Sequence, residues 1–439
     1  MFSNPLFGEF AAKIRDADNA LQVLRAWDVI GGLDGASSLR VVTVLRDYDR
    51  NVTLRGLNLR DLAGRKLCTP YFLSESLHFS SLAINDESLN NGQAQVAIDG
   101  SLMLDTNVAS YLSTYINRES FGSMTSEAIN LIDQLLFESP NYDYIPYLLE
   151  NSKKFFHLSD SDHPLDEDQF WRNLDAGFKK NLVALKQFAS IDEARYRKNG
   201  SSEPRLTEEM AIEDARRDSF DFYFGEFGKT QLADTRDRFK ISLILMYKLL
   251  YIQLSSKARE KNKILSFMTF MLDRLRAFFE RETFLALDYF RLGQTLPSFQ
   301  KVHKGMPVSR PKAKSIVENM TWDLLIPRLI ESLASELGEG DFFVPHVLTW
   351  DTALRRSLES FPAKACIYDD SSRRVVTIPA HSSEERLTET LGADFTNEYF
   401  SLDARTKRLK RKKLSPGQLQ TLLKEVEDDA LSVICQRRS

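Results

Sequence analysis

Asp105 stands where an apolar run, Leu102–Leu104, meets a segment with helical spacing that begins at Thr106. A short, bounded apolar run is typical of a strand buried on both faces, and Thr106 and Asn107 are residue types that favour a helix start. In parallel sheets, sites form at the carboxyl ends of the strands. We therefore expect the Asp105 carboxylate to face such an edge, oriented by Asn107. The alternative is that Asp105 caps the helix and does no chemistry.

Two further aspartates occupy comparable junctions. The apolar segment Asp341–Leu348 predicts a strand, and Thr349 and Asp351 follow it just before another helix. Asp323 is expected to open the amphipathic helix Trp322–Leu337. Acids at such junctions can converge on one edge of a sheet.

The acids together predict a metal site. Crowded carboxylates repel one another unless a cation neutralises them, and hard oxygen ligands suit Mg²⁺ or Mn²⁺. Glu150, about two turns into the helix predicted over Asp143–Asn151, adds a fourth acid at the edge of an apolar face. A divalent ion held by Asp105, Asp323 and Asp351 would lower the pKa of a bound water and neutralise charge on a phosphate. The six histidines show no His-Glu-x-x-His spacing, and the sequence has no G-x-x-x-x-G-K-S/T phosphate loop.

This arrangement of residues resembles the PIN-domain nuclease family. The family pattern is an apolar strand ending in Asp-Thr/Ser-Asn/Ser, then a Glu some forty residues on, an Asp at the head of an apolar helix, and a strand ending in Thr-x-Asp. Leu102–Asn107 matches the first element and Glu150 the second. Asp323 matches the third, and Thr349-Trp350-Asp351 the fourth.

The resemblance implies an α/β fold, with a three-layer α/β/α domain on a mainly parallel sheet. It also implies Mg²⁺- or Mn²⁺-dependent hydrolysis of a phosphodiester, usually in RNA. Compact family members have a short stretch between the Glu and the third acid, whereas about 170 residues separate Glu150 from Asp323 here. The long spacing indicates a large all-α insertion, and it leaves Glu280 or Glu282 as alternatives for the middle acid.

The expected domain organisation is discontinuous. Residues 1–94 form a mixed α/β region. Residues 95–155 and 318–380 form the PIN-like nuclease domain, interrupted by a helical insertion over 156–317, and 381–439 form a charged helical tail. Within these parts, Asp99-Gly100 predicts a turn between two short strands, and the proline- and lysine-containing segment Gln294–Lys314 predicts a linker.

Composition places limits on the class of protein. The chain has 439 residues, 58 Lys and Arg against 62 Asp and Glu, and a net charge of −4, so it does not bind nucleic acid by bulk charge alone. The basic run Arg405–Lys413 is interpreted as a solvated helical face, with contact to a phosphate backbone as the alternative. Three widely spaced cysteines and the absence of an apolar segment of bilayer length favour the cytoplasm and no membrane association.

We expect an endoribonuclease. Its role as a toxin-like or anti-phage effector is expected from the resemblance alone, and its partner would be a regulatory protein or a second copy of the chain. One alternative is a non-catalytic helical interaction protein whose acids are helix caps. Another is a structure-specific DNA nuclease that uses the same acids. Trp322 and Trp350, each next to a candidate ligand, are interpreted mainly as core residues, with stacking on a base as the alternative.

Overall fold

The computed structural model describes residues 5–46, 53–54, 57–58, 68–72, 76–92, 94–120, 122, 125–138, 142–155, 166–304, 309–335 and 341–436. The chain forms two compact units, each assembled from three segments. The first unit comprises Met1–Arg236, Leu329–Asp351 and Ala365–Thr377; the second comprises Asp237–Arg328, Thr352–Lys364 and Ile378–Ser439. Residues 156–236 of the expected insertion therefore share a unit with residues 95–155.

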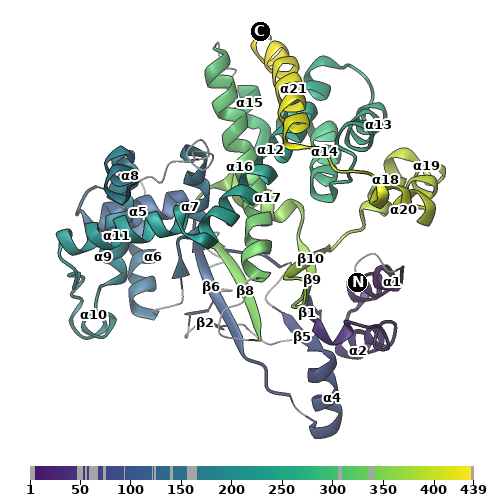
Figure 1. The fold of residues 1–439 in the computed structure, drawn as a ribbon. Coiled ribbons are helices and arrows are strands. Elements are labelled where there is room, and N and C mark those ends of the chain that lie inside the picture. Colours follow the sequence, from purple (N-terminus) through teal and green to yellow (C-terminus); the bar gives the residue numbers. More distant parts are fainter. Residues whose placement is uncertain are drawn as a thin grey trace. The chain divides into compact units, whose positions relative to one another are not determined.

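A small, mainly parallel sheet with strand order β4-β8-β6-β7 lies in the first unit. Figure 1 shows its two central strands, β6 and β8, side by side. Strand β6 (Ile98–Leu104) pairs in parallel with β8 (Phe342–Leu348) along its whole length and with the short β7 (Tyr142–Asp143) on its other side. The edge strand β4 (Cys68–Pro70) is antiparallel to β8. Because β6 is one continuous strand, the turn predicted at Asp99-Gly100 is wrong.

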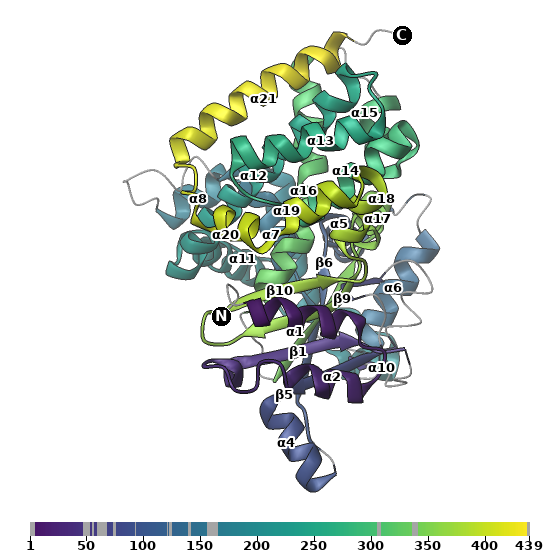
Figure 2. The ribbon, with the colours of Figure 1, turned by 90° about the vertical axis from the view of Figure 1, so that its right-hand side faces the viewer.

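A second, antiparallel sheet brings the N-terminal region together with residues near 370. Its order is β10-β9-β1-β5, and Figure 2 shows these four strands side by side. Strand β1 runs antiparallel to both neighbours. The Phe79 ring on β5 lies 5.0 Å from the Phe342 ring on β8, so the two sheets touch. The bounds are β1 (Leu39–Val44), β5 (Leu77–Ser81), β9 (Ala363–Asp369) and β10 (Arg374–Pro379), with a separate hairpin of β2 (Thr53–Leu54) and β3 (Leu57–Asn58).

The rest of the described part of the first unit is mainly helical. Its helices share an apolar core with β6 and β8, in which Phe155, Phe170, Phe178 and Tyr223 pack ring against ring. The helices are α1 (Pro5–Asp16), α2 (Ala20–Trp27), α4 (Leu82–Asn91), α5 (Thr106–Ile116), α6 (Thr125–Glu138), α7 (Ile145–Asn151), α8 (Glu167–Asn173), α9 (Ala176–Ala189), α10 (Glu193–Asn199) and α11 (Glu208–Phe224), with short 3-10 turns at Ala36–Ser38 and Ser152–Lys154.

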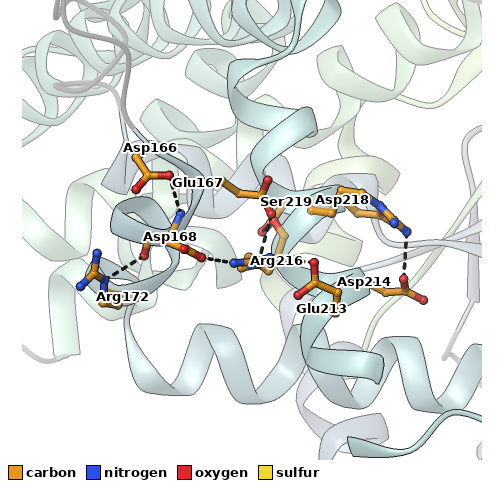
Figure 3. A network of polar contacts seen from close by, with 10 residues as sticks. Asp166, Glu167, Asp168, Arg172, Glu213, Asp214, Arg216, Asp218 and Ser219 are labelled. Atoms are coloured by element: carbon orange, nitrogen blue, oxygen red, sulfur yellow. Dashed lines mark hydrogen bonds and ion pairs between the residues drawn. The ribbon is translucent and has the colours of Figure 1, made fainter. Parts of the chain in front are cut away.

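Arg216 joins α8 to α11 in this unit. Its guanidinium pairs with Glu167 at 3.2 Å, with Asp168, and with Glu213 at 2.7 Å on its own helix (Figure 3). The arginine is about a quarter exposed, so the surrounding solvent only partly screens these pairs.

The described part of the second unit is almost entirely helical. Its core is built from Ile244, Tyr247 and Leu250 of α12 and from the apolar faces of later helices, including α21. The helices that lie in this unit wholly or, for α12 and α16, in part are α12 (Glu226–Ser255), α13 (Glu260–Phe270), α14 (Glu280–Leu292), α15 (Gln300–Lys304), α16 (Arg310–Ser335), α17 (Thr352–Ser360), α18 (Ser383–Leu391), α19 (Ala393–Phe400), α20 (Leu402–Lys410) and α21 (Pro416–Gln436), with a π-helical turn at Met271–Leu275 and 3-10 turns at Gly293–Thr295 and Pro297–Phe299. No helix of the described residues is long and apolar enough to cross a membrane.

Helix α16 begins well before the point expected from the sequence. It starts at Arg310, so the predicted linker Gln294–Lys314 is wrong for its last part, which is helical, while residues 305–308 of that segment lie outside the described residues. Asp323 consequently lies inside the helix rather than at its head. Pro311 sits in the first turn, where a missing backbone N–H costs nothing. The lysines that suggested a linker are good helix formers.

Candidate active site

Asp105 lies immediately after β6, where the parallel ladder with β8 ends. Its backbone N–H donates to the Leu348 carbonyl at 3.3 Å, which extends the ladder by one residue and brings the two strand ends together. Its carboxylate Oδ1 accepts the Val108 N–H at 2.8 Å, so Asp105 is the N-cap of α5. The cap role expected as the alternative is thus present, and it occupies one of the two carboxylate oxygens.

The other oxygen of Asp105 faces β8. Oδ2 accepts a hydrogen bond from the Thr349 hydroxyl and a long one, 3.4 Å, from the Asn107 amide. The same Thr349 oxygen accepts the Asp351 N–H at 2.8 Å. Thr349 is only 1 % exposed, so this buried hydroxyl ties the Asp105 carboxylate to the backbone that carries Asp351.

Glu150 reaches the same edge from the other side of β6. Because β7 is parallel to β6, the following helix α7 starts beside α5, and Glu150 lies near its end. The Thr106 hydroxyl, one residue after Asp105, donates to Glu150 Oε2. Three of the four expected acids therefore lie around the start of α5 in the first unit.

The electrostatics of Asp105 show that these acids interact. The pKa of Asp105 is raised from 3.8 to about 7, mainly by burial. The Thr349 and Val108 hydrogen bonds lower this pKa, and the negative charges of Glu150 and Asp351 contribute smaller increases. The side chain is 4 % exposed. No cationic side chain of the described residues is among the groups that act on this pKa. The ionised form of Asp105 is consequently disfavoured in the protein alone.

Asp323 belongs to the second unit, within α16. Its assignment as a metal ligand stays a prediction. The neighbouring Trp322 is 1 % exposed and stacks on Phe239, with ring centroids 4.7 Å apart, as expected for a core residue.

The alternative middle acids, Glu280 and Glu282, lie in the first turn of α14 in the second unit. Glu282 is 6 % exposed and accepts a hydrogen bond from Arg328. A buried acid with an arginine partner has a structural explanation, because pairing offsets the cost of removing its charge from water.

Asp143 is a further acid at this sheet, which the sequence placed only at the start of the helix predicted over Asp143–Asn151. It ends β7, accepts the Ser101 hydroxyl at 2.6 Å and the Ile145 N–H at 3.1 Å, and burial raises its pKa. Ser101 lies within β6, so Asp143 links the two strands. The sequence signal that could have indicated this acid is its position between Tyr142 and Tyr144, directly before a helix.

An aromatic pair borders the carboxylates. Trp350, between Thr349 and Asp351, meets Tyr111 of α5 edge to face with ring centroids 4.7 Å apart. Within the described residues, the buried indole N–H of Trp350 has no hydrogen-bond partner. Trp350 also packs against the apolar core of the first unit, as expected for a core residue.

The donor set fits a hard divalent cation in its chemistry. Asp105, Glu150 and Asp351 supply carboxylate oxygens, the ligands preferred by Mg²⁺ and Mn²⁺, and a cation would offset the charge that raises the pKa of Asp105. Among the described residues, however, no group of three or more His, Cys, Asp or Glu is already arranged to hold a metal ion. The metal site therefore stays a prediction.

Several residues of the basic run contact other residues of the second unit. Arg408 lies over the Tyr399 ring, 4.5 Å from its centroid, and Arg411 donates to the Leu272 carbonyl at 2.6 Å. Lys407 pairs with Asp403 at 2.6 Å. Arg408 and Arg411 therefore contact the protein and not only solvent, and the interpretation of the whole run as a solvated helical face stays a prediction.

Comparison of the chain with protein-family models, with curated proteins and with solved structures gives no match.

Proposed function

We propose that the protein is a metal-dependent hydrolase of phosphodiester bonds in nucleic acid, with RNA as substrate. One observation carries the proposal: the carboxylates of Asp105, Glu150 and Asp351 gather at the carboxyl edge of the parallel β6–β8 pair. There the buried Thr349 hydroxyl donates to the Asp105 carboxylate and accepts the Asp351 N–H. A buried acid at a strand edge whose pKa is raised, as that of Asp105 is, is more common at functional sites than elsewhere.

Each residue has a role in this proposal. Asp105 and Asp351 bind the cation, Glu150 orients the attacking water, and Thr349 holds Asp105 in position through its hydroxyl. Asp323 is included as a ligand on the strength of the PIN resemblance. When bound, a divalent ion supplies an activated water and neutralises charge on the scissile phosphate. The raised pKa of Asp105 means that tight cation binding is favoured above about pH 7, where the carboxylate is ionised.

The finer parts of the proposal rest on the same resemblance. They are the three-layer PIN-like arrangement of the first unit, the preference for RNA over DNA, and the role as a toxin-like or anti-phage effector held in check by a partner. The cytoplasm is proposed as the location, which agrees with the free thiols of Cys366 and Cys435.

A cleavage assay tests the proposal. End-labelled single-stranded RNA, single-stranded DNA and flapped DNA are each incubated with the full chain and Mn²⁺, with EDTA as the metal-free arm. Asp105→Asn, Asp323→Asn and Asp351→Asn are compared with Asp86→Asn, the same chemical change at an exposed position on α4.

The proposal predicts Mn²⁺-dependent RNA cleavage that Asp86→Asn retains and that Asp105→Asn and Asp351→Asn lose by at least about a hundredfold, the size typical for removing a group that stabilises transition-state charge. Cleavage of DNA alone would favour the structure-specific DNA nuclease. Full activity in Asp105→Asn and Asp351→Asn would refute the site. No cleavage of any substrate by the wild type would favour the interaction protein, in which Asp105 is only the N-cap that the structure contains.

A further inference from the structure

A hollow lies at the opposite end of α5 from the carboxylates. It has a volume of about 540 Å³ and is lined by residues that include Tyr115, Arg118, Glu119, Asp133 and Tyr196. Its walls come from the end of α5, from α6 and from α10, all within the first unit (Figure 1). The volume falls within the roughly 300–1,000 Å³ typical of small-ligand pockets.

Arg118 has an unusual backbone at the edge of this hollow. Its N–H donates to the Tyr115 carbonyl at 3.1 Å, and the Glu119 N–H donates to the Thr114 carbonyl at 2.9 Å. This pair of bonds is the Schellman motif, whose left-handed position is usually glycine. Arg118 occupies it with φ of 55°. Because a side chain there costs roughly 1 kcal/mol or more, local stability does not explain why this position holds an arginine.

The side chain of Arg118 is the available cation of the hollow. It is exposed, and within the described residues it has no hydrogen-bond or ion-pair partner. The two acids are already engaged: Glu119 pairs with Lys180 at 2.6 Å, and Asp133 accepts the Tyr196 hydroxyl. A ligand entering the hollow therefore meets an unpaired guanidinium, which binds phosphate oxygens through a planar fork of donors.

Two half-buried tyrosines supply aromatic rings to the hollow. Tyr115 comes from α5 and Tyr196 from α10, and both line the hollow. Tyrosine rings beside a cationic groove are what proteins use to bind single-stranded nucleic acid, since every base has a face that can stack.

Helix α5 connects the hollow to the candidate active site. Asp105 caps its start and Arg118 follows its end. The helix has 11 residues, so at about 1.5 Å per residue its ends are about 16 Å apart. One face of the helix lies between the two sites, in line with Arg118. It carries three residues at helical spacing that are each at least partly exposed, Asn107, Tyr111 and Thr114. A strand of a few nucleotides spans this distance.

We propose that the hollow at the end of α5 is a nucleotide-binding subsite that holds a base and its phosphate of a single-stranded substrate, a few nucleotides from the bond that is cut. The base stacks on Tyr115 and Tyr196, and the phosphate pairs with Arg118. This inference rests on the proposed function, because it names the substrate as single-stranded nucleic acid and gives it a path along α5.

Binding in the absence of metal tests the subsite. Fluorescence anisotropy of a labelled single-stranded RNA is measured with the full chain in EDTA over a series of salt concentrations. The variants are Arg118→Gly, Arg118→Lys and Tyr196→Leu. Lys198→Ala is the matched control, because it removes one exposed positive charge from α10 at a position that does not line the hollow. Thermal melting is recorded for each protein.

The proposal predicts a specific pattern. Arg118→Gly weakens RNA binding and lowers the steepness of log affinity against log salt by about 0.7, because one phosphate contact to a single strand is lost. The same substitution raises the melting temperature, because glycine suits the left-handed position. Arg118→Lys keeps most of the affinity. Tyr196→Leu weakens binding at least about fivefold, as expected for one stacked base. Lys198→Ala stays near the wild type.

Other results separate the subsite from the proposed function. If the wild type cleaves RNA but Arg118→Gly binds with the affinity and salt slope of Lys198→Ala, the subsite is wrong and the nuclease proposal stands. If Arg118→Gly loses binding but no cleavage occurs with any metal, the subsite stands and the nuclease proposal falls. A wild type that does not bind single-stranded RNA overturns the subsite.

Discussion

Replacing Asp105 with Asn should stabilise the metal-free protein at high pH while removing the proposed nuclease activity. Asn is as good an N-cap as Asp, so the bond from the Val108 N–H is kept. Asn also has no charge to bury. The substitution therefore isolates the free-energy cost of holding an ionised carboxylate at this edge of the sheet.

The magnitude follows from the pKa of Asp105, which rises from 3.8 to about 7 on folding, mainly through burial. A tenfold change in a protonation equilibrium corresponds to about 1.4 kcal/mol, so the ionised carboxylate costs up to about 4 kcal/mol of folding stability. Because the folded protein holds the proton more tightly than the unfolded chain, the cost is absent below about pH 4. It grows through the window up to about pH 7 and is complete above it.

Thermal unfolding in EDTA across a pH series measures this cost. The melting temperature of Asp105→Asn should match the wild type near pH 4 and exceed it increasingly up to about pH 8. The exposed control Asp86→Asn should follow the wild type throughout. Added Mn²⁺ should narrow the gap at pH 8, because a cation that binds the folded wild type stabilises it by mass action. A constant difference between Asp105→Asn and wild type at all pH values would refute the argument that burial of the charge is the cause.

Three further substitutions test other contacts. Thr349→Val removes the hydroxyl that donates to Asp105 and should cost about 1–3 kcal/mol in urea unfolding at pH 8; an equal cost at pH 4 would show that the ionised carboxylate is not involved. Glu282→Ala leaves Arg328 without the carboxylate that it contacts and should cost about 3 kcal/mol, and a loss below about 1 kcal/mol would contradict its burial. Arg216→Ala should increase hydrogen exchange in α8, because its ion pairs with Glu167 and Asp168 are lost. The difference in exchange from wild type should be smaller in high salt, which screens these pairs. Unchanged exchange would mean that packing alone holds α8.

Local sequence was sufficient to predict a strand and the following helix start where an apolar run ends directly at a helix-capping residue. The run Leu102–Leu104 followed by Asp105 predicted a buried strand and a helix cap, and both are present. The strand before Thr349 was predicted for the same reason. In these cases the strand and the start of the helix are encoded by adjacent residues.

What failed depends on partners that are distant in sequence. Asp99 and Gly100 suggest a turn by themselves, but pairing with Phe343 and Val344 of β8 keeps the strand extended. The contact of Thr349 with Asp105 crosses 244 residues, so no local pattern indicates it. The placement of β1 beside β9 is equally long-range and joins the N-terminal region to residues near 366.

The start of α16 failed for a different reason. Its first turn contains Pro311 and lysines, a composition that occurs both in linkers and in helix starts. The buried side chains Ala313 and Val317 and the later apolar residues decide in favour of the helix. Tertiary burial therefore selected between two interpretations that local composition left open.

The central claim, that the carboxylates at the β6–β8 edge hold a divalent cation, is tested most directly by anomalous diffraction from crystals of the protein grown with Mn²⁺ at pH 8. The account predicts a manganese peak at coordination distance, about 2.2 Å, from carboxylate oxygens of both Asp105 and Asp351. It also predicts that this peak is missing from crystals of Asp351→Asn. Crystals that show manganese elsewhere, with none between these two side chains, would contradict it.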